Sequence, residues 1–291
     1  MFHGVYTALV TPFKGSGIDY EALSVIIEKQ VAGGVDGIVP MGTTGESPTV
    51  TFDEHREFIK KVVALVGGRL KVIAGTGANA TEEAVFLSKH AQDSGVDGLL
   101  QVVPYYNKPT QKGLIAHFEK IASAVSIPIM LYNIPGRTGI NMEPASVLEL
   151  TKRSGNIVSI KEASGDINQM MKVIELCGDR ITLLSGDDNL LLPVLAIGGR
   201  GVVSVLSNLV PSDVGQVIRS FNEGDLDKSR ELFYRLLPLC RAMFYETNPG
   251  PVKAAMAMLG YCSGDLRLPL HELDEGNREK LARALSDYGL L

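Results

Sequence analysis

The chain has 291 residues, with 28 Lys and Arg against 33 Asp and Glu, and therefore a formal net charge of −5. Apolar residues make up 45% and charged residues 21%, a balance that excludes a disordered chain and argues against a nucleic-acid-binding surface. The length suits one large α/β barrel with an appendage, or two ordinary domains.

Eight short apolar runs along the chain predict the strands of a parallel sheet covered on both faces. The runs lie at 5–13, 37–42, 71–77, 98–106, 127–135, 157–164, 181–188 and 202–208. Amphipathic stretches between them, such as 20–32, 53–66, 81–94 and 167–177, predict helices. Eight alternating βα units favour an α/β fold of the (β/α)8, or TIM barrel, type. A doubly wound open sheet is the alternative, although no Gly-x-Gly-x-x-Gly turn follows the first strand.

The pattern changes after residue 222, where helices are expected at 225–245, 252–259 and 277–288 and no further strand follows. The Asn-Pro-Gly-Pro sequence at 248–251 predicts a turn between two of these helices. We therefore expect two parts, a catalytic barrel over 1–222 and a small C-terminal helical region over 223–291.

A tetrapeptide repeat supports successive βα units. Gly-Val-Asp-Gly occurs at 34–37, before the second predicted strand, and again at 95–98, before the fourth. Glycine at the end of a helix readily takes the left-handed conformation, so both copies predict the same helix-to-strand turn, although chance is the alternative explanation.

The location of the protein is also predicted from its composition. The cysteines Cys177, Cys240 and Cys262 are widely spaced and odd in number, which favours a reducing compartment over a disulfide framework. The sequence shows no signal-peptide pattern and no apolar run of the roughly 18 to 20 residues that a membrane span requires. A cytoplasmic protein is expected.

Lys161 is the strongest catalytic candidate, because it lies in a predicted strand, Ile-Val-Ser-Ile-Lys-Glu-Ala at 157–163. Strand alternation puts Lys161 on one face and its neighbours Ile160 and Glu162 on the other. Inside a barrel, burial favours the neutral amine, a nucleophile that forms a Schiff base with a carbonyl substrate. The alternative is a structural ion pair with a carboxylate on another strand.

Polar side chains near the ends of other predicted strands also face the expected active-site end of the barrel. Tyr132 could relay protons beside Lys161, or could be a core aromatic residue. Thr43 and Thr44 could hold a carboxylate through hydroxyl and backbone N–H groups, or could belong to an ordinary turn. Arg137 could bind a carboxylate with both guanidinium nitrogens, or could be a solvated surface residue.

Metal and nucleotide sites are not expected. The five histidines are scattered without the i, i+4 pair of a helical zinc site, and no Gly-Lys-Ser/Thr phosphate loop is present. Asp187 and Asp188 could hold a cation, but adjacent acids after a strand more often cap the following helix. No metal and no cofactor are predicted.

Together these motifs resemble a known family. The segments at 42–47, 132–139 and 160–164 are similar to the signatures of the pyruvate-dependent class I aldolases related to N-acetylneuraminate lyase, and most of all to its dihydrodipicolinate synthase branch. The resemblance extends over essentially the whole chain, including 74–79, 104–107, 184–188 and 248–249.

The resemblance implies a lyase of lysine and diaminopimelate biosynthesis that condenses pyruvate with L-aspartate 4-semialdehyde to 4-hydroxy-tetrahydrodipicolinate. Lys161 would form the Schiff base, and Tyr132, Thr43 and Tyr106 would relay protons, with Tyr106 supplied across a subunit interface. The expected substrate-binding residues are Thr44, Arg137, Val203 and Gly186. A homotetramer built as a dimer of dimers is expected.

Two questions stay open at this point. The same lysine and tyrosine occur in lyases of N-acetylneuraminate and keto-deoxy sugar acids, so another pyruvate-dependent aldolase is the alternative function. The resemblance also implies a site at a subunit interface for inhibition by lysine, although Phe52 stands where sensitive relatives commonly carry histidine. The residues at that site would be Ser47, Pro48, His55, Asn79, Glu83 and Tyr105.

Overall fold

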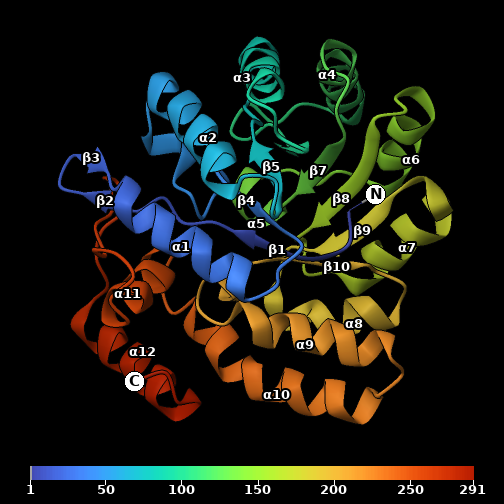
Figure 1. The fold of residues 1–291 in the computed structure, drawn as a ribbon. Coiled ribbons are helices and arrows are strands. Elements are labelled where there is room, and N and C mark those ends of the chain that lie inside the picture. Colours follow the sequence, from blue (N-terminus) through green and yellow to red (C-terminus); the bar gives the residue numbers. More distant parts are fainter. Residues whose placement is uncertain (1) are drawn as a thin grey trace.

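The computed structural model describes residues 2–291, and its centre is a closed barrel of eight parallel strands (Figure 1). The order around the barrel is β1-β10-β9-β8-β7-β6-β5-β4, so each strand except at the closure lies beside its neighbour in sequence. This confirms the (β/α)8 prediction and excludes the open sheet. The barrel strands are β1 (Gly4–Ala8), β4 (Gly37–Val39), β5 (Lys71–Gly75), β6 (Gly98–Val102), β7 (Ile129–Asn133), β8 (Ile157–Glu162), β9 (Thr182–Ser185) and β10 (Gly201–Ser204).

The observed strands are shorter than the apolar runs predicted, mainly at their C-terminal ends. The run at 98–106, for example, leaves the sheet after Val102, because the following Pro104 cannot donate to a ladder. Phe13, expected at the end of the first strand, instead belongs to a small antiparallel pair, β2 (Phe13–Lys14) with β3 (Gly17–Ile18). The residues that were predicted at the C-terminal ends of the strands instead lie in the loops that form the candidate site.

The two copies of the Gly-Val-Asp-Gly tetrapeptide form the same turn and the same kind of hydrogen bond. Gly34 and Gly95 both have positive φ, +67° and +85°, as the predicted turn requires. The carboxylate that follows each glycine then accepts a hydrogen bond from a neighbouring strand, Asp36 from the N–H of Val5 and Asp97 from the N–H of Val72, each at 2.8 Å. Both copies thus link the start of one strand to the strand beside it.

Helices surround the barrel because their apolar faces cover the outer side of the strands (Figure 1). Several begin at a side-chain cap: Asp19 accepts from two backbone N–H groups of α1, and Thr51 and Glu54 form a capping box at α2. The helices are α1 (Tyr20–Ala32), α2 (Phe52–Val66), α3 (Thr81–Asp93), α4 (Gln111–Ala124), α5 (Pro135–Thr138), α6 (Pro144–Arg153), α7 (Ile167–Cys177), α8 (Leu191–Ala196), α9 (Pro211–Asn222), α10 (Leu226–Ala242), α11 (Gly250–Met258) and α12 (Glu275–Tyr288), with 3-10 turns η1 (Ser47–Thr49), η2 (Gly178–Arg180), η3 (Asp188–Leu190) and η4 (Leu206–Asn208).

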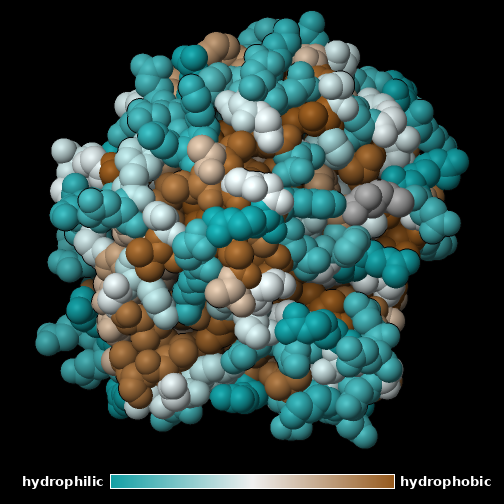
Figure 2. Space-filling view, viewed as in Figure 1, coloured by the Kyte–Doolittle hydropathy of each residue, from teal (hydrophilic) through white to brown (hydrophobic). Residues whose placement is uncertain are grey.

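The last three helices, α10 to α12, follow the final βα unit and lie together on one side of the barrel (Figure 1). α10 packs on α9, and α12 packs on both α10 and α11. The division into a barrel over 1–222 and a helical region over 223–291 stays a prediction. In the same view the face of the molecule is mostly hydrophilic, with apolar patches, a clear one at the lower left near α12 (Figure 2). No helix within residues 2–291 is long and apolar enough to cross a membrane.

Candidate active site

Lys161 and Tyr132 lie side by side inside the barrel. They are register partners on β8 and β7, and their exposed fractions are 6% and 4%. The Lys161 Nζ lies 4.1 Å from the centroid of the Tyr132 ring. Among residues 2–291 no carboxylate lies within ion-pair distance of this nitrogen. Lys161 therefore does not form the structural ion pair that was the alternative. A buried amine without a counter-ion is suited to nucleophilic attack on a carbonyl carbon.

Gly186, at the end of β9, leaves room for the Lys161 side chain. A Cβ atom at position 186 would lie 2.5 Å from the Cβ of Ala163 and 3.1 Å from the Cε of Lys161. Val203, another predicted site residue, is fully buried on β10, beside Tyr6 of β1. The space available to the Lys161 side chain therefore depends on the absence of a side chain at position 186.

A cavity of about 570 Å³ opens at the C-terminal end of the barrel strands. Its walls come from the loops after β4, β5, β6 and β7 and from α2 and α3, where TIM-barrel chemistry takes place. Thr43, Tyr132 and Arg137 line this cavity. Lys161 lies beside Tyr132 but does not itself line the cavity. The structure thus brings two residues of the proposed proton relay, Thr43 and Tyr132, and the proposed carboxylate-binding Arg137 to one space.

Asn248, a residue that the sequence did not single out as functional, connects two predicted binding residues. Its Nδ2 donates to the Thr44 Oγ1 at 3.0 Å, and its carbonyl accepts from the Arg137 guanidinium at 3.1 Å. Thr44 is buried and Arg137 is exposed at the mouth. The contacts span 204 and 111 residues of sequence, so only the motif at 248–249 could have drawn attention to this position.

Tyr106 stands apart from the other proposed relay residues. Its side chain is 90% exposed and it does not line the cavity of its own chain. Its φ of +71° lies in the left-handed region, which is uncommon for a residue with a Cβ atom. The neighbouring Tyr105 does line the cavity, and burial raises the pKa of its phenol.

A buried carboxylate lies next to Lys161 in sequence but points away from it. Glu162 accepts hydrogen bonds from the Asn133 amide at 3.1 Å, the Ser164 N–H at 2.8 Å and the Gln169 amide at 3.2 Å. Burial raises the pKa of the Glu162 carboxyl, and the three donors oppose that rise. Glu162 therefore connects β7, β8 and α7 behind the reactive face.

The two acids after β9 do not cap the following helix, so that prediction is wrong. Asp188 instead accepts from the Ser204 hydroxyl at the end of β10, at 2.5 Å, and from the N–H groups of Val205 at 2.9 Å and Leu206 at 3.0 Å just after it. The neighbouring Asp187 makes no capping bond. The N–H groups of Val205 and Leu206 need an acceptor, and the Asp188 carboxylate supplies it instead of capping η3. Burial raises the pKa of both carboxyls, and Lys161 opposes the rise.

Among residues 2–291 no group of three or more His, Cys, Asp or Glu side chains could hold a metal ion.

Residues of the predicted lysine site also meet at the cavity. His55 is buried, with its Nε2 2.9 Å from the Gly75 carbonyl oxygen, and burial lowers the pKa of its ring. Asn79 is not among the lining residues, but its amide donates to the Tyr105 carbonyl at 3.3 Å. Phe52, which departs from the expected pattern, lines the cavity and is 54% exposed. The lining residues of the predicted set are Ser47, Pro48, His55, Glu83 and Tyr105.

The model of one protein family, described as the dihydrodipicolinate synthetase family, matches residues 1–288. The chain belongs to this family. A relative from Endomicrobium trichonymphae, named 4-hydroxy-tetrahydrodipicolinate synthase, is 54% identical over the full length of both chains.

Solved structures of dihydrodipicolinate synthases agree with this membership. The Aquifex aeolicus enzyme has a TM-score of 0.98 and 48% identity, with 99% of each chain covered. The Cyanidioschyzon merolae enzyme, solved with lysine bound, has a TM-score of 0.97 and 43% identity, covering 100% of this chain and 99% of that one. The fold and family of the resemblance are therefore confirmed, whereas the individual site residues stay predictions.

Proposed function

We propose that this member of the dihydrodipicolinate synthetase family is a class I aldolase-type lyase that condenses pyruvate with L-aspartate 4-semialdehyde to give 4-hydroxy-tetrahydrodipicolinate, a step of diaminopimelate and lysine biosynthesis. The observation that carries the proposal is Lys161, a buried amine with no carboxylate of residues 2–291 within ion-pair distance, 4.1 Å from the ring of Tyr132 in a closed barrel. Full-length relatives that bear the synthase name support the choice of reaction.

In the proposed first half-reaction, the Lys161 nitrogen attacks the C2 carbonyl carbon of pyruvate, and the oxygen leaves as water. Tyr132 and Thr43, together with Tyr106 of a second subunit, move the protons that these steps require. Thr44, the Val203 backbone and Gly186 hold pyruvate. The resulting iminium ion loses a C3 proton, which gives an enamine with a nucleophilic carbon.

In the second half-reaction the enamine carbon attacks the aldehyde carbon of the semialdehyde, whose carboxylate Arg137 binds. The amine of the semialdehyde then attacks the iminium carbon, which closes the ring and releases Lys161. Overall one molecule of water is lost. The fixed guanidinium of Arg137, held by the Asn248 carbonyl at 3.1 Å, suits a planar carboxylate.

Borohydride reduction tests the covalent step directly. Pyruvate with borohydride should leave a stable adduct on Lys161, detected by mass spectrometry, and Lys161→Ala should abolish it. Arg137→Ala should keep the adduct but lower kcat/KM for the semialdehyde about tenfold or more, because a charge-assisted contact is lost. Absence of the adduct in the parent protein would refute the mechanism, and equal loss of trapping and semialdehyde use in Arg137→Ala would contradict the role given to Arg137.

Lysine inhibition is a second, separate part of the proposal. Glu83 and His55 line the same cavity as Tyr132, and the Glu83 carboxylate would attract an ammonium group of lysine. Initial rates should fall in millimolar lysine, and Glu83→Gln should weaken that effect. Rates unchanged by lysine would rule out inhibition at this site.

Assembly and location complete the proposal. We propose a homotetramer built as a dimer of dimers, which light scattering or ultracentrifugation would measure. We also propose a cytoplasmic location, because all three cysteines, Cys177, Cys240 and Cys262, are free thiols, as suits a reducing compartment.

A further inference from the structure

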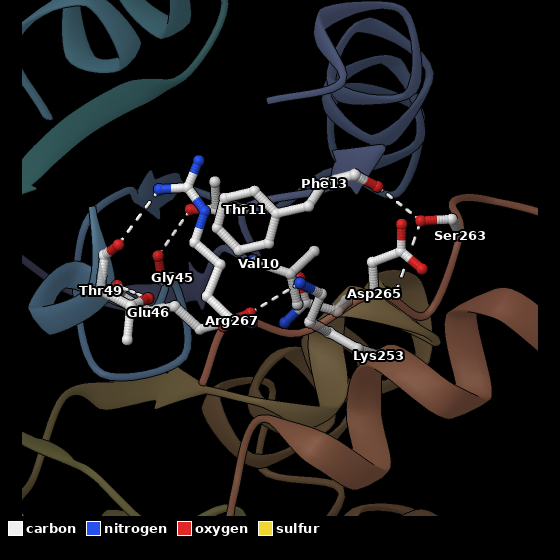
Figure 3. Close-up of polar contacts among 11 residues, drawn as sticks. Val10, Thr11, Phe13, Gly45, Glu46, Thr49, Lys253, Ser263, Asp265 and Arg267 are labelled. Atoms are coloured by element: carbon white, nitrogen blue, oxygen red, sulfur yellow. Dashed lines mark hydrogen bonds and ion pairs between the residues drawn. The ribbon is translucent and has the colours of Figure 1, made fainter. Parts of the chain in front are cut away.

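A buried ion pair lies directly behind the loop that carries Thr43 and Thr44. The Lys253 Nζ of α11 is 2.6 Å from the Glu46 Oε1, and the exposed fraction of both side chains is 0%. The two residues are 207 positions apart in the sequence. Figure 3 shows the pair where the C-terminal segment meets the loop after β4.

Such a pair is a poor device for stability alone. Removing two charges from water costs much of what their attraction returns, and apolar replacements of buried pairs are often at least as stable. The barrel could close this contact with apolar side chains, as it does elsewhere in its core. A fully buried charge pair instead fixes one geometry, because separating the two side chains would leave a charge buried without its counter-ion.

That geometry is the turn that carries the two threonines. Glu46 has a φ of +55°, in the left-handed region, and its N–H donates to the Thr43 carbonyl at 3.1 Å. Both carboxylate oxygens are used, because Oε2 accepts from the Arg267 N–H at 3.1 Å while Oε1 binds Lys253. The contacts of the Glu46 carboxylate therefore stabilise the left-handed backbone conformation at this residue.

The partner of Glu46 is itself fixed by aromatic contact. The Lys253 ammonium lies 4.3 Å from the centroid of the Phe13 ring, and the Arg267 guanidinium lies 4.4 Å from the same centroid. Arg267 also binds Glu54 at the start of α2, with nitrogen–oxygen distances of 2.6 and 2.8 Å. Lys253 and Arg267 of the C-terminal region thus bind the Glu46 carboxylate beside Phe13 of the N-terminal hairpin (Figure 3), and Arg267 also links this cluster to α2.

We propose that Glu46 and Lys253 are positioning residues that hold the turn at 42–47, so that Thr43 and Thr44 meet pyruvate and the proton relay in the reactive arrangement. The inference rests on the proposed function, since it assigns no contact between either residue and a substrate. It makes α11 part of the catalytic apparatus, although none of its residues lines the cavity.

The test is the double variant Glu46→Gln/Lys253→Met, which removes both charges and nearly keeps both shapes. At subsaturating pyruvate, borohydride trapping on Lys161 should be at least tenfold slower, because a displaced turn misplaces reacting groups. The final trapped fraction and the melting temperature should stay close to those of the parent. The matched control, Glu28→Gln/Arg69→Met, neutralises an exposed pair at 2.6 Å between α1 and the loop before β5 and should trap at the parent rate.

A second variant covers the case in which the double variant does not fold. Glu46→Gln keeps the side-chain shape, but an amide has one acceptor oxygen where the carboxylate serves two donors, so trapping should slow about threefold.

The possible outcomes separate the two proposals. A parent protein that gives no adduct refutes the proposed function, whereas a parent that traps normally beside folded Glu46 and Lys253 variants with the parent rate refutes only the positioning role. Reduced trapped fraction at an unchanged rate per trapped site would show that the pair serves stability alone, and would also overturn the inference.

Discussion

At the scale of single residues, the reactivity of the site depends on what is missing around Lys161. Within residues 2–291 no carboxylate lies within ion-pair distance of the amine, and position 186 carries no side chain where a Cβ would press on Ala163 and Lys161. A buried lysine whose side chain is not crowded at position 186 is suited to Schiff-base chemistry.

Gly186→Ala tests this account of the space around Lys161. The added Cβ would lie 2.5 Å from one neighbour and 3.1 Å from the Lys161 Cε, so the lysine chain must shift. We expect borohydride trapping of pyruvate to slow about tenfold or more, since small misplacements of reacting groups are costly. The control is Gly155→Ala, where a Cβ meets no atom within 4 Å. Parent-like trapping in Gly186→Ala would show that the lysine does not need this room.

At the scale of elements, the sequence predicted more about where strands begin than about where they end. Periodicity locates Lys161 on an inward face, because alternation is a local property of the chain. It does not show that Asp188 binds the N–H groups after β10, or that Lys253 reaches Glu46, since these partners are 17, 18 and 207 residues apart. Long-range polar contacts depend on how elements meet, which apolar patterns do not encode.

The buried His117 ring, which connects α4 to α3, predicts that stability depends on pH. Its Nδ1 lies 2.9 Å from the Thr81 Oγ1 at the start of α3, its Nε2 has no partner within residues 2–291, and burial lowers the ring pKa from 6.5 to about 4. A lowered pKa means that the unfolded chain binds the proton more readily than the folded chain does. The contribution of neutral His117 to the free energy of unfolding is therefore complete above pH 6.5 and is lost as the pH falls toward 4.

The measurement is the free energy of unfolding at pH 7 and pH 5, at one protein concentration. Protonation of His117 in the unfolded chain should reduce it by about 2 kcal/mol at pH 5. His117→Asn keeps an amide toward Thr81 but does not titrate, so the drop between the two pH values should be smaller by about that amount. An identical pH dependence in parent and variant would contradict the assignment to His117.

At the scale of the whole molecule, one proposed relay residue is not in the site of its own chain. Tyr106 is 90% exposed and absent from the cavity wall that Tyr132 and Thr43 line. An exposed aromatic ring at the mouth of a barrel, held in a left-handed backbone conformation with φ of +71°, is suited to contact with a second subunit. Under the proposed function, each site is then complete only in an assembly.

Complementation between two inactive variants tests that assembly. Lys161→Ala removes the nucleophile, and Tyr106→Phe removes the relay hydroxyl but keeps the ring. In a mixed dimer, the site with an intact Lys161 receives an intact Tyr106 from the Lys161→Ala subunit. Random pairing of equal amounts should therefore restore about a quarter of the parent activity, because half of the dimers are mixed and one of their two sites is complete.

The separate variants, each assayed alone at the same total concentration, are the controls for that experiment. Co-expression with two different tags allows the mixed dimers to be purified, and their activity per dimer should approach half that of the parent. If Tyr106 acted within its own subunit, no site in the mixed dimer would hold both groups, and the mixture would show only the sum of the two separate activities. The complementation yield thus measures whether the relay crosses between subunits, independently of any change in stability.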